Sequence, residues 1–122
     1  MARSIILRLG DLREILDGIS GMTAGVAYPE FAASWSLQRA VERSLEMVSA
    51  AVRQLPPDLT AAEPGIPWRQ IAAMGQLLQP PDRRVATRVL WNSVLEHLPP
   101  LSDAIDRLIV LVENRQPKAP GA

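Results

Sequence analysis

The sequence predicts an all-α protein, built as one up-and-down bundle of about five helices. Three observations support this prediction. Apolar residues recur at steps of three and four along several segments, as they do on one face of an α-helix. No segment alternates with the period of two that is typical of a strand, and 122 residues suffice for a single domain. We expect that domain over residues 1–115 and a flexible tail over residues 116–122, which carry prolines, a glycine and no periodic apolar side chain.

The first two expected helices carry the longest apolar stripes. The first stripe runs from Ile5 to Ile19, and the glycines that follow predict its end near residues 20–24. The second runs from Leu37 to Leu55, and Pro56 stops it, because proline lacks the N–H donor and clashes with the preceding turn. Both stripes are wide, and a helix that is apolar on two sides often packs against a partner, so we expect a homodimer. The additional apolar residues are Ile6, Ile15, Met22, Ala40, Met47 and Ala51.

Prolines divide the second half of the chain. Residues 56–67 contain four prolines and a glycine, which predicts an ordered or semi-ordered loop. A short third helix is expected from Trp68 to the proline pair at 80–81, and a fourth over residues 82–98. The next proline pair, at 99–100, should break or kink the chain before a last helix that carries apolar residues from Leu101 to Val112.

Composition limits the function classes. The chain has no cysteine, which excludes disulfides, thiolate zinc sites and a cysteine nucleophile, and fits a cytoplasmic location. Thirteen basic and thirteen acidic residues cancel, which argues against a protein that holds nucleic acid mainly through counterion release. No window approaches the roughly 18 uncharged apolar residues of a membrane span, and the first residues lack the apolar stretch of a secretory signal.

Residues able to carry chemistry are few. His97 is the sole histidine, so neither a histidine-based metal site nor a bound cofactor is expected, and a structural role at a helix end is favoured. A glycine-rich phosphate loop and a nucleophile elbow are both absent. Arg83, Arg84 and Arg88 form a small basic cluster that is more typical of a solvated helix face than of an RNA site. The three tryptophans, which occupy apolar helical positions, are expected to be core or interface anchors: Trp35, Trp68 and Trp91.

Several segments give a resemblance to a known family. They are FAASWSLQRAVERSLEMV (residues 31–48), LPPDL (55–59), IPWRQIAAM (66–74), VLW (89–91) and LPPL (98–101). Together they resemble the HepT-like proteins, HEPN-fold partners of MNT-type minimal nucleotidyltransferases, and the likeness extends over about residues 3–113. It implies a HEPN helical bundle, usually a homodimer, from a prokaryotic toxin–antitoxin module.

The resemblance also implies where an active site would lie. Active members cleave RNA without a metal, using an Arg-x4-6-His motif after a methionine, and a dimer cleft brings two copies of the motif together. Many carry a tyrosine two residues beyond the histidine, which the cognate nucleotidyltransferase can adenylylate. When Met74 and Trp91 are aligned with the family, Gly75, Pro80 and Asp82 occupy the arginine, histidine and tyrosine positions.

Further departures concern the same motif. The family's Gly-Glu-Ala in the second helix is replaced by Ser49-Ala50-Ala51, and no Arg-x4-6-His occurs anywhere in the chain. RNA cleavage needs a group that moves a proton near neutral pH and a cation that stabilises the phosphorane, and glycine and proline supply neither. The resemblance therefore implies a degenerate, non-catalytic dimer that binds a nucleotidyltransferase-type partner.

Two alternatives remain open at this stage. One is a ribonuclease, or an RNA-binding protein, that uses other residues, for example Arg83, Arg84 and His97 gathered across a dimer cleft. The other is nucleotide binding in a cleft of the bundle, for which the sequence offers no motif.

Overall fold

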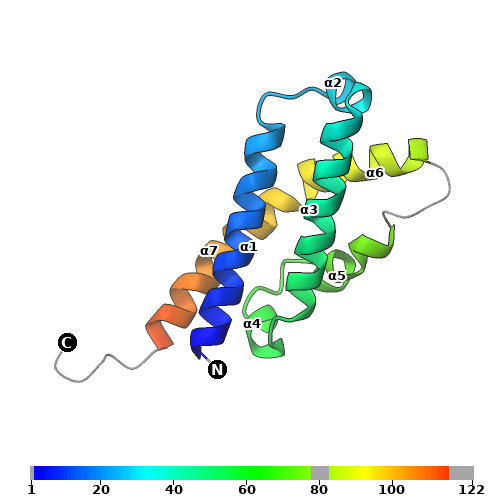
Figure 1. Cartoon of the computed structure of the whole chain (residues 1–122). Coiled ribbons are helices and arrows are strands. Elements are labelled where there is room, and N and C mark those ends of the chain that lie inside the picture. The colour runs from blue at the N-terminus through cyan, green and yellow to red at the C-terminus, as the bar shows by residue number, and fades with distance from the viewer. Residues whose placement is uncertain (1, 78–82, 116–122) are drawn as a thin grey trace.

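The structure is a computed structural model that describes residues 2–77 and 83–115, and these residues form seven helices (Figure 1). No strand occurs in this part of the chain, so the predicted all-α class is confirmed. The proline pair at 80–81 and the tail at 116–122 lie outside the described residues. The helices, in chain order, are α1 (Ala2–Thr23), α2 (Tyr28–Ala33), α3 (Trp35–Arg53), α4 (Pro57–Ala61), α5 (Trp68–Leu77), α6 (Arg83–Glu96) and α7 (Leu98–Arg115).

The long helices α1 and α3 lie antiparallel and side by side, and they organise the bundle. Helix α7 packs along α1, and α5 packs along α3, while α6 passes behind α3 at a steep angle (Figure 1). The most extensive helix–helix packing joins α3 to α5, α1 to α7, and α1 to α3. The core lies between these pairs, and one face of α1 and α3 remains outside it.

The predicted apolar stripes form the core. Leu9, Leu12, Leu16 and Ile19 of α1 are buried, and Val41, Leu45, Val48 and Val52 of α3 face them. Burial of this apolar surface stabilises the fold by roughly 25 cal/mol per Å². The other core side chains, which come from the shorter helices, the segments between them and α7, are Phe31, Leu55, Leu59, Ile66, Ile71, Met74, Leu90, Trp91, Val94, Leu98, Leu101, Ala104, Ile105, Leu108 and Val112.

Residues 28–33 form a helix of their own, ahead of the second long helix. Ser34 has an extended backbone, and its Oγ accepts a hydrogen bond from the Leu37 amide at 3.2 Å, as an N-cap does. The Gln38 Nε2 donates to the Phe31 and Ala32 carbonyls at 3.0 and 2.9 Å. Because these side chains satisfy the end groups of both helices, the chain turns at Ser34 instead of continuing one helix.

The prolines also start helices, and here the sequence interpretation was wrong. Pro57 begins α4 within the segment predicted to be a loop, and Pro99 and Pro100 lie in the first turn of α7. The first turn of a helix tolerates proline because its N–H groups have no partner within the helix. The break predicted at residues 99–100 therefore falls at His97, between α6 and α7.

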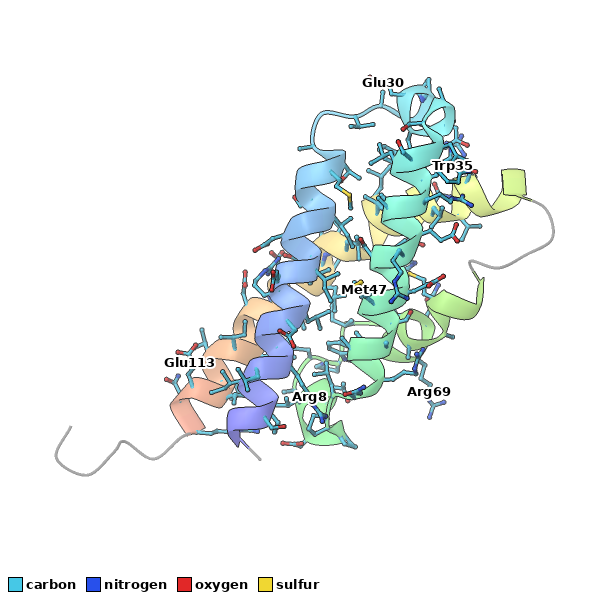
Figure 2. All side chains as sticks on the ribbon, viewed as in Figure 1. Arg8, Glu30, Trp35, Met47, Arg69 and Glu113 are labelled. Atoms are coloured by element: carbon cyan, nitrogen blue, oxygen red, sulfur yellow. The ribbon has the colours of Figure 1, made fainter. Side chains whose placement is uncertain are left out.

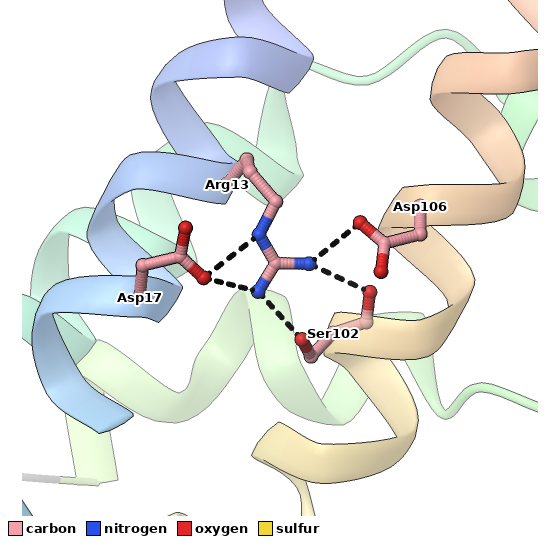
Figure 3. Close-up of polar contacts among 4 residues, drawn as sticks. All are labelled: Arg13, Asp17, Ser102 and Asp106. Atoms are coloured by element: carbon pink, nitrogen blue, oxygen red, sulfur yellow. Dashed lines mark hydrogen bonds and ion pairs between the residues drawn. The ribbon is translucent and has the colours of Figure 1, made fainter. Parts of the chain in front are cut away.

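Arg13 joins the first helix to the last (Figure 3). Its guanidinium donates to the Ser102 carbonyl at 3.0 Å, the Ser102 Oγ at 2.6 Å and the Asp106 Oδ1 at 2.9 Å. On its own helix it also donates to the Asp17 Oδ1 at 3.1 Å. A planar guanidinium with five donors can satisfy several acceptors at once, so this residue fixes the position of α7 against α1.

Candidate functional site

Helices α3 and α5 meet through Ser49. Ser49 is fully buried, and its Oγ donates to the Ile71 carbonyl at 2.7 Å. The Gly75 amide donates to the same Oγ at 3.0 Å. One hydroxyl thus bridges a carbonyl and an amide that lie one turn apart in α5, and it ties the end of α5 to α3.

Gly75 has room for a side chain. A Cβ atom placed there would lie 3.6 Å from the Ser49 Cβ and 4.0 Å from the Glu46 Cα, which are ordinary contact distances. The residue lies within α5, and its backbone does not have a positive φ. Packing therefore does not require glycine at this position.

A shallow hollow of about 660 Å³ lies beside Gly75, between α3 and α5. Arg43, Arg53 and Arg69 line it together with a single acidic residue, Glu46. The Arg53 Nη1 donates to the Ala72 carbonyl at 2.8 Å, and Arg43 forms an ion pair with Glu46 at 3.4 Å. The remaining lining residues, which are small, are Ala50, Ala72, Ala73 and Gly75. The hollow thus offers three cations against one anion, and could attract an anionic group.

The hollow lacks a pair of groups that could accept and donate a proton near neutral pH. Its ionisable lining residues are the three arginines, which stay protonated, and Glu46, which is paired with Arg43. No histidine lines it. Sequence reasoning missed these arginines as a group, because Arg43 and Arg69 are 26 positions apart and each alone reads as an ordinary solvent-facing charge.

The other positions singled out from the sequence are not assembled into a site within one chain. Pro80 and Asp82 lie outside the described residues. Arg83 and Arg84 begin α6, whereas His97 follows its last residue, so about 20 Å of helix at 1.5 Å per residue separates them. Arg88 is engaged elsewhere, with its guanidinium carbon 4.0 Å from the centroid of the Tyr28 ring.

His97 occupies the turn between α6 and α7, and is half-buried. Its backbone N–H donates to the Ser93 carbonyl at 3.0 Å, and its carbonyl accepts from the Leu101 amide at 3.2 Å. It lines a small hollow of about 160 Å³ whose other polar residues, Gln70, Asn92 and Ser93, are uncharged. These are backbone bonds, which do not depend on the imidazole, so the role of the His97 side chain stays a prediction.

The three tryptophans have different environments. Trp91 is buried, and its ring centroid lies 4.8 Å from that of Phe31. Trp68 is half-buried, and its Nε1 donates to the Glu63 carbonyl at 3.0 Å. Trp35 is 69% exposed, so it is not a core residue of the chain. Whether Trp35 anchors an interface stays a prediction.

Two other kinds of site are absent from the described part of the chain. Residues 2–77 and 83–115 contain no group of three or more His, Asp or Glu side chains that could hold a metal ion. In the same residues, no helix is both long enough and apolar enough to cross a membrane.

Comparison with known proteins identifies the family. The family described as ribonuclease HepT-like matches residues 12–108 of this chain. The protein named "Probable ribonuclease HepT" from Thermococcus cleftensis is 33% identical over 108 residues, covering 88% of this chain and 98% of that protein. "Putative RNase MJ1216" from Methanocaldococcus jannaschii is 27% identical over 113 residues, covering 93% of both chains. No solved structure matches. The chain belongs to the ribonuclease HepT-like family, as its sequence resemblance predicted, and its helical bundle agrees with that membership.

Proposed function

We propose that this chain is a non-catalytic HepT-like protein that acts by binding. Its partners are a second copy of itself and a nucleotidyltransferase-type protein, within a cytoplasmic module of the toxin–antitoxin kind. One observation carries the proposal: Gly75, the residue at the family's arginine position, lies beside a hollow that holds no histidine and no acid–base pair for proton transfer near neutral pH. The loss of the motif histidine and tyrosine, where Pro80 and Asp82 stand, supports the same conclusion.

The chemistry of the hollow explains why cleavage is not proposed. Attack by a ribose 2′-hydroxyl needs a base to take its proton and an acid to protonate the leaving oxygen. Arg43, Arg53 and Arg69 could neutralise phosphate charge, but an arginine does not exchange protons near neutral pH. The Glu46 carboxylate could accept a proton, but no residue that lines the hollow would donate one to the leaving oxygen, so the hollow lacks the acid–base pair of such a reaction.

An RNA-cleavage assay tests the loss of activity. The purified protein is incubated with single-stranded and structured RNA, with EDTA present, and the products are resolved on a denaturing gel. We expect intact RNA. Cleavage that co-purifies with the protein and disappears in His97→Ala would overturn the non-catalytic assignment. The matched control is Asn92→Ala, a change in the same small hollow that removes no titratable group.

A co-expression experiment tests the partner. The chain is expressed together with any nucleotidyltransferase-type protein encoded beside it, with an affinity tag on the latter only. We expect the two to remain together through affinity and size-exclusion chromatography. Separation of the two proteins at micromolar concentration contradicts the proposed partner, and leaves the RNA result unaffected.

A further inference from the structure

A pocket of about 420 Å³ lies between the last turns of α1 and the junction of α6 with α7. Helix α1 is bonded to α7 at Arg13 and continues to Thr23, so its last turn extends past the start of α7 (Figure 1). Helix α6 crosses behind α3 at a steep angle instead of following α1, which leaves the pocket between the three helices. Its volume is within the range of about 300–1,000 Å³ that small-molecule pockets occupy.

This pocket is separate from the hollow described above. Its lining residues belong to α1, the turn after α1, α6 and α7, and none of them lines the hollow beside Gly75. Figure 2 shows Arg69, which lines that hollow, on the far side of α3 from α1. A ligand in this pocket would therefore not depend on the residues that the proposed function uses.

The floor of the pocket is apolar. Leu16, Ile19, Val94 and Leu98 are core side chains, and each also lines the pocket. Leu95 lines it as well, although 56% of this residue is exposed. A ligand with an apolar body would cover this surface and remove it from water, which is favourable.

Asp103 is the only charged residue that lines the pocket. It is exposed, and it forms no ion pair within residues 2–77 and 83–115. Arg107, one turn further along α7, attracts this carboxylate, but the Arg107 guanidinium is engaged by Glu63, with an oxygen at 2.7 Å. Arg13 is likewise occupied by the acceptors described above. The charge of Asp103 is thus left for a ligand to neutralise.

A hydroxyl on the opposite wall adds a second acceptor. The Thr23 Oγ1 donates its hydrogen to the Ile19 carbonyl at 2.8 Å, so its lone pairs remain available to a ligand that donates. The Ser20 hydroxyl, which is exposed, can accept as well. An ammonium group has three donors and no acceptor. The polar groups of the pocket therefore match a cation that donates hydrogen bonds.

We infer that this pocket binds a small amphiphilic cation, namely a primary amine, in its protonated form, attached to one apolar group. The apolar group covers the leucine and valine side chains of the floor, and the ammonium lies between Asp103 of α7 and Thr23 of α1. The three helices that bound the pocket suit a small molecule better than the length of a partner helix. This binding activity goes beyond the proposed function and requires neither the dimer nor the partner.

Other classes of ligand fit the pocket less well. An anion would meet the Asp103 carboxylate and find no cation among the lining residues. A neutral apolar molecule would take water from that carboxylate without supplying a donor in exchange, which is unfavourable. A polyamine carries several charges, whereas the pocket offers one carboxylate and an apolar floor. The pocket should therefore distinguish ligands by charge when their apolar parts are identical.

An NMR titration with three matched probes tests this selectivity. The ¹⁵N-labelled protein is titrated at pH 7 with hexylamine, which is protonated, with 1-hexanol and with hexanoate. We expect hexylamine to shift the amide signals of Ser20, Thr23, Leu95 and Asp103, and to bind about threefold to tenfold more tightly than hexanol. Hexanoate should not saturate these signals. Equal binding of hexylamine and hexanol, or shifts confined to other residues, overturns the inference.

Two variants locate the site. Asp103→Asn keeps the shape of the side chain and removes its charge, so it should weaken hexylamine binding about threefold to tenfold and leave hexanol unchanged. Glu113→Gln is the matched control, because it removes an exposed carboxylate near the other end of α7 (Figure 2). Ser20→Phe fills the pocket from an exposed position, and Gly21→Phe, an unobstructed neighbour that does not line it, is the corresponding control. We expect Ser20→Phe to abolish binding and Gly21→Phe to retain it.

The outcomes that contradict the inference are equally specific. Wild type that shows no shift at about 10 mM hexylamine, where a ligand with a millimolar dissociation constant would be mostly bound, has no such site. A change of less than about twofold in Asp103→Asn shows that this carboxylate does not hold the cation. Because Asp103→Asn alters no packing, it remains decisive even if Ser20→Phe fails to fold, which circular dichroism would reveal.

Discussion

Replacing Ser49 with alanine removes the hydroxyl that links α3 to α5. The Oγ makes two hydrogen bonds, to the Ile71 carbonyl at 2.7 Å and from the Gly75 amide at 3.0 Å, in a fully buried position. Each such bond contributes about 0.5–1.5 kcal/mol net. The carbonyl and the amide are four residues apart in α5, which is the spacing of a hydrogen bond within the helix, so the variant leaves them a partner and the loss is limited. We expect Ser49→Ala to lower the free energy of unfolding by about 1–2 kcal/mol.

Urea denaturation followed by circular dichroism measures this change, at one protein concentration so that any dimer contributes equally. Ser44→Ala is the control, because the Ser44 Oγ donates to the Ala40 carbonyl of its own helix and to no other helix. We expect Ser44→Ala to change the free energy of unfolding by less than about 0.5 kcal/mol. If the two variants are equally stable and their m-values match wild type, the Ser49 hydroxyl does not hold α5 to α3, and the reasoning is refuted.

Three further predictions concern Gly75, Glu63 and Arg13. Gly75→Arg should keep the free energy of unfolding of the monomer within about 1 kcal/mol of wild type, because the gain in helix propensity over glycine is opposed by the three arginines that line the hollow. It should also weaken the proposed dimer most at low salt, which sedimentation in two salt concentrations checks. The Arg107 side chain, by hydrogen bonding to Glu63, lowers the pKa of that carboxyl, so the pair stabilises the fold at neutral pH and the effect disappears as the pH falls through the lowered pKa. Urea midpoints of wild type and Glu63→Gln should therefore differ at pH 7 and converge in acid; a constant difference contradicts this. Arg13→Ala should lower the free energy of unfolding, measured by urea denaturation, by about 1–2 kcal/mol, because it removes the bonds to Ser102 and Asp106. An unchanged urea midpoint would show that the packing of α7 does not depend on these bonds.

Local patterns were enough to predict the helices, because residues three and four apart share a face of the same helix whatever surrounds it. The stripes from Ile5 and from Leu37 predicted α1 and α3 on this basis. Proline was ambiguous, since it stops one helix and fits the first turn of the next equally well. The choice at Pro57 and at Pro99 depended on how the following segment packed, which the sequence interpretation could not resolve.

The family could also be recognised from the sequence, because short runs such as residues 66–74 resemble it independently of the fold. What only the tertiary structure decided is which distant residues meet. The Ser49 bridge to Gly75 spans 26 positions, the hollow gathers arginines from two helices, and Trp35 is exposed, so of its two predicted roles, core or interface anchor, the structure excludes the first. Contacts of this kind depend on how helices pack against one another, and helical periodicity specifies which face of a helix is apolar without specifying the helix that covers it.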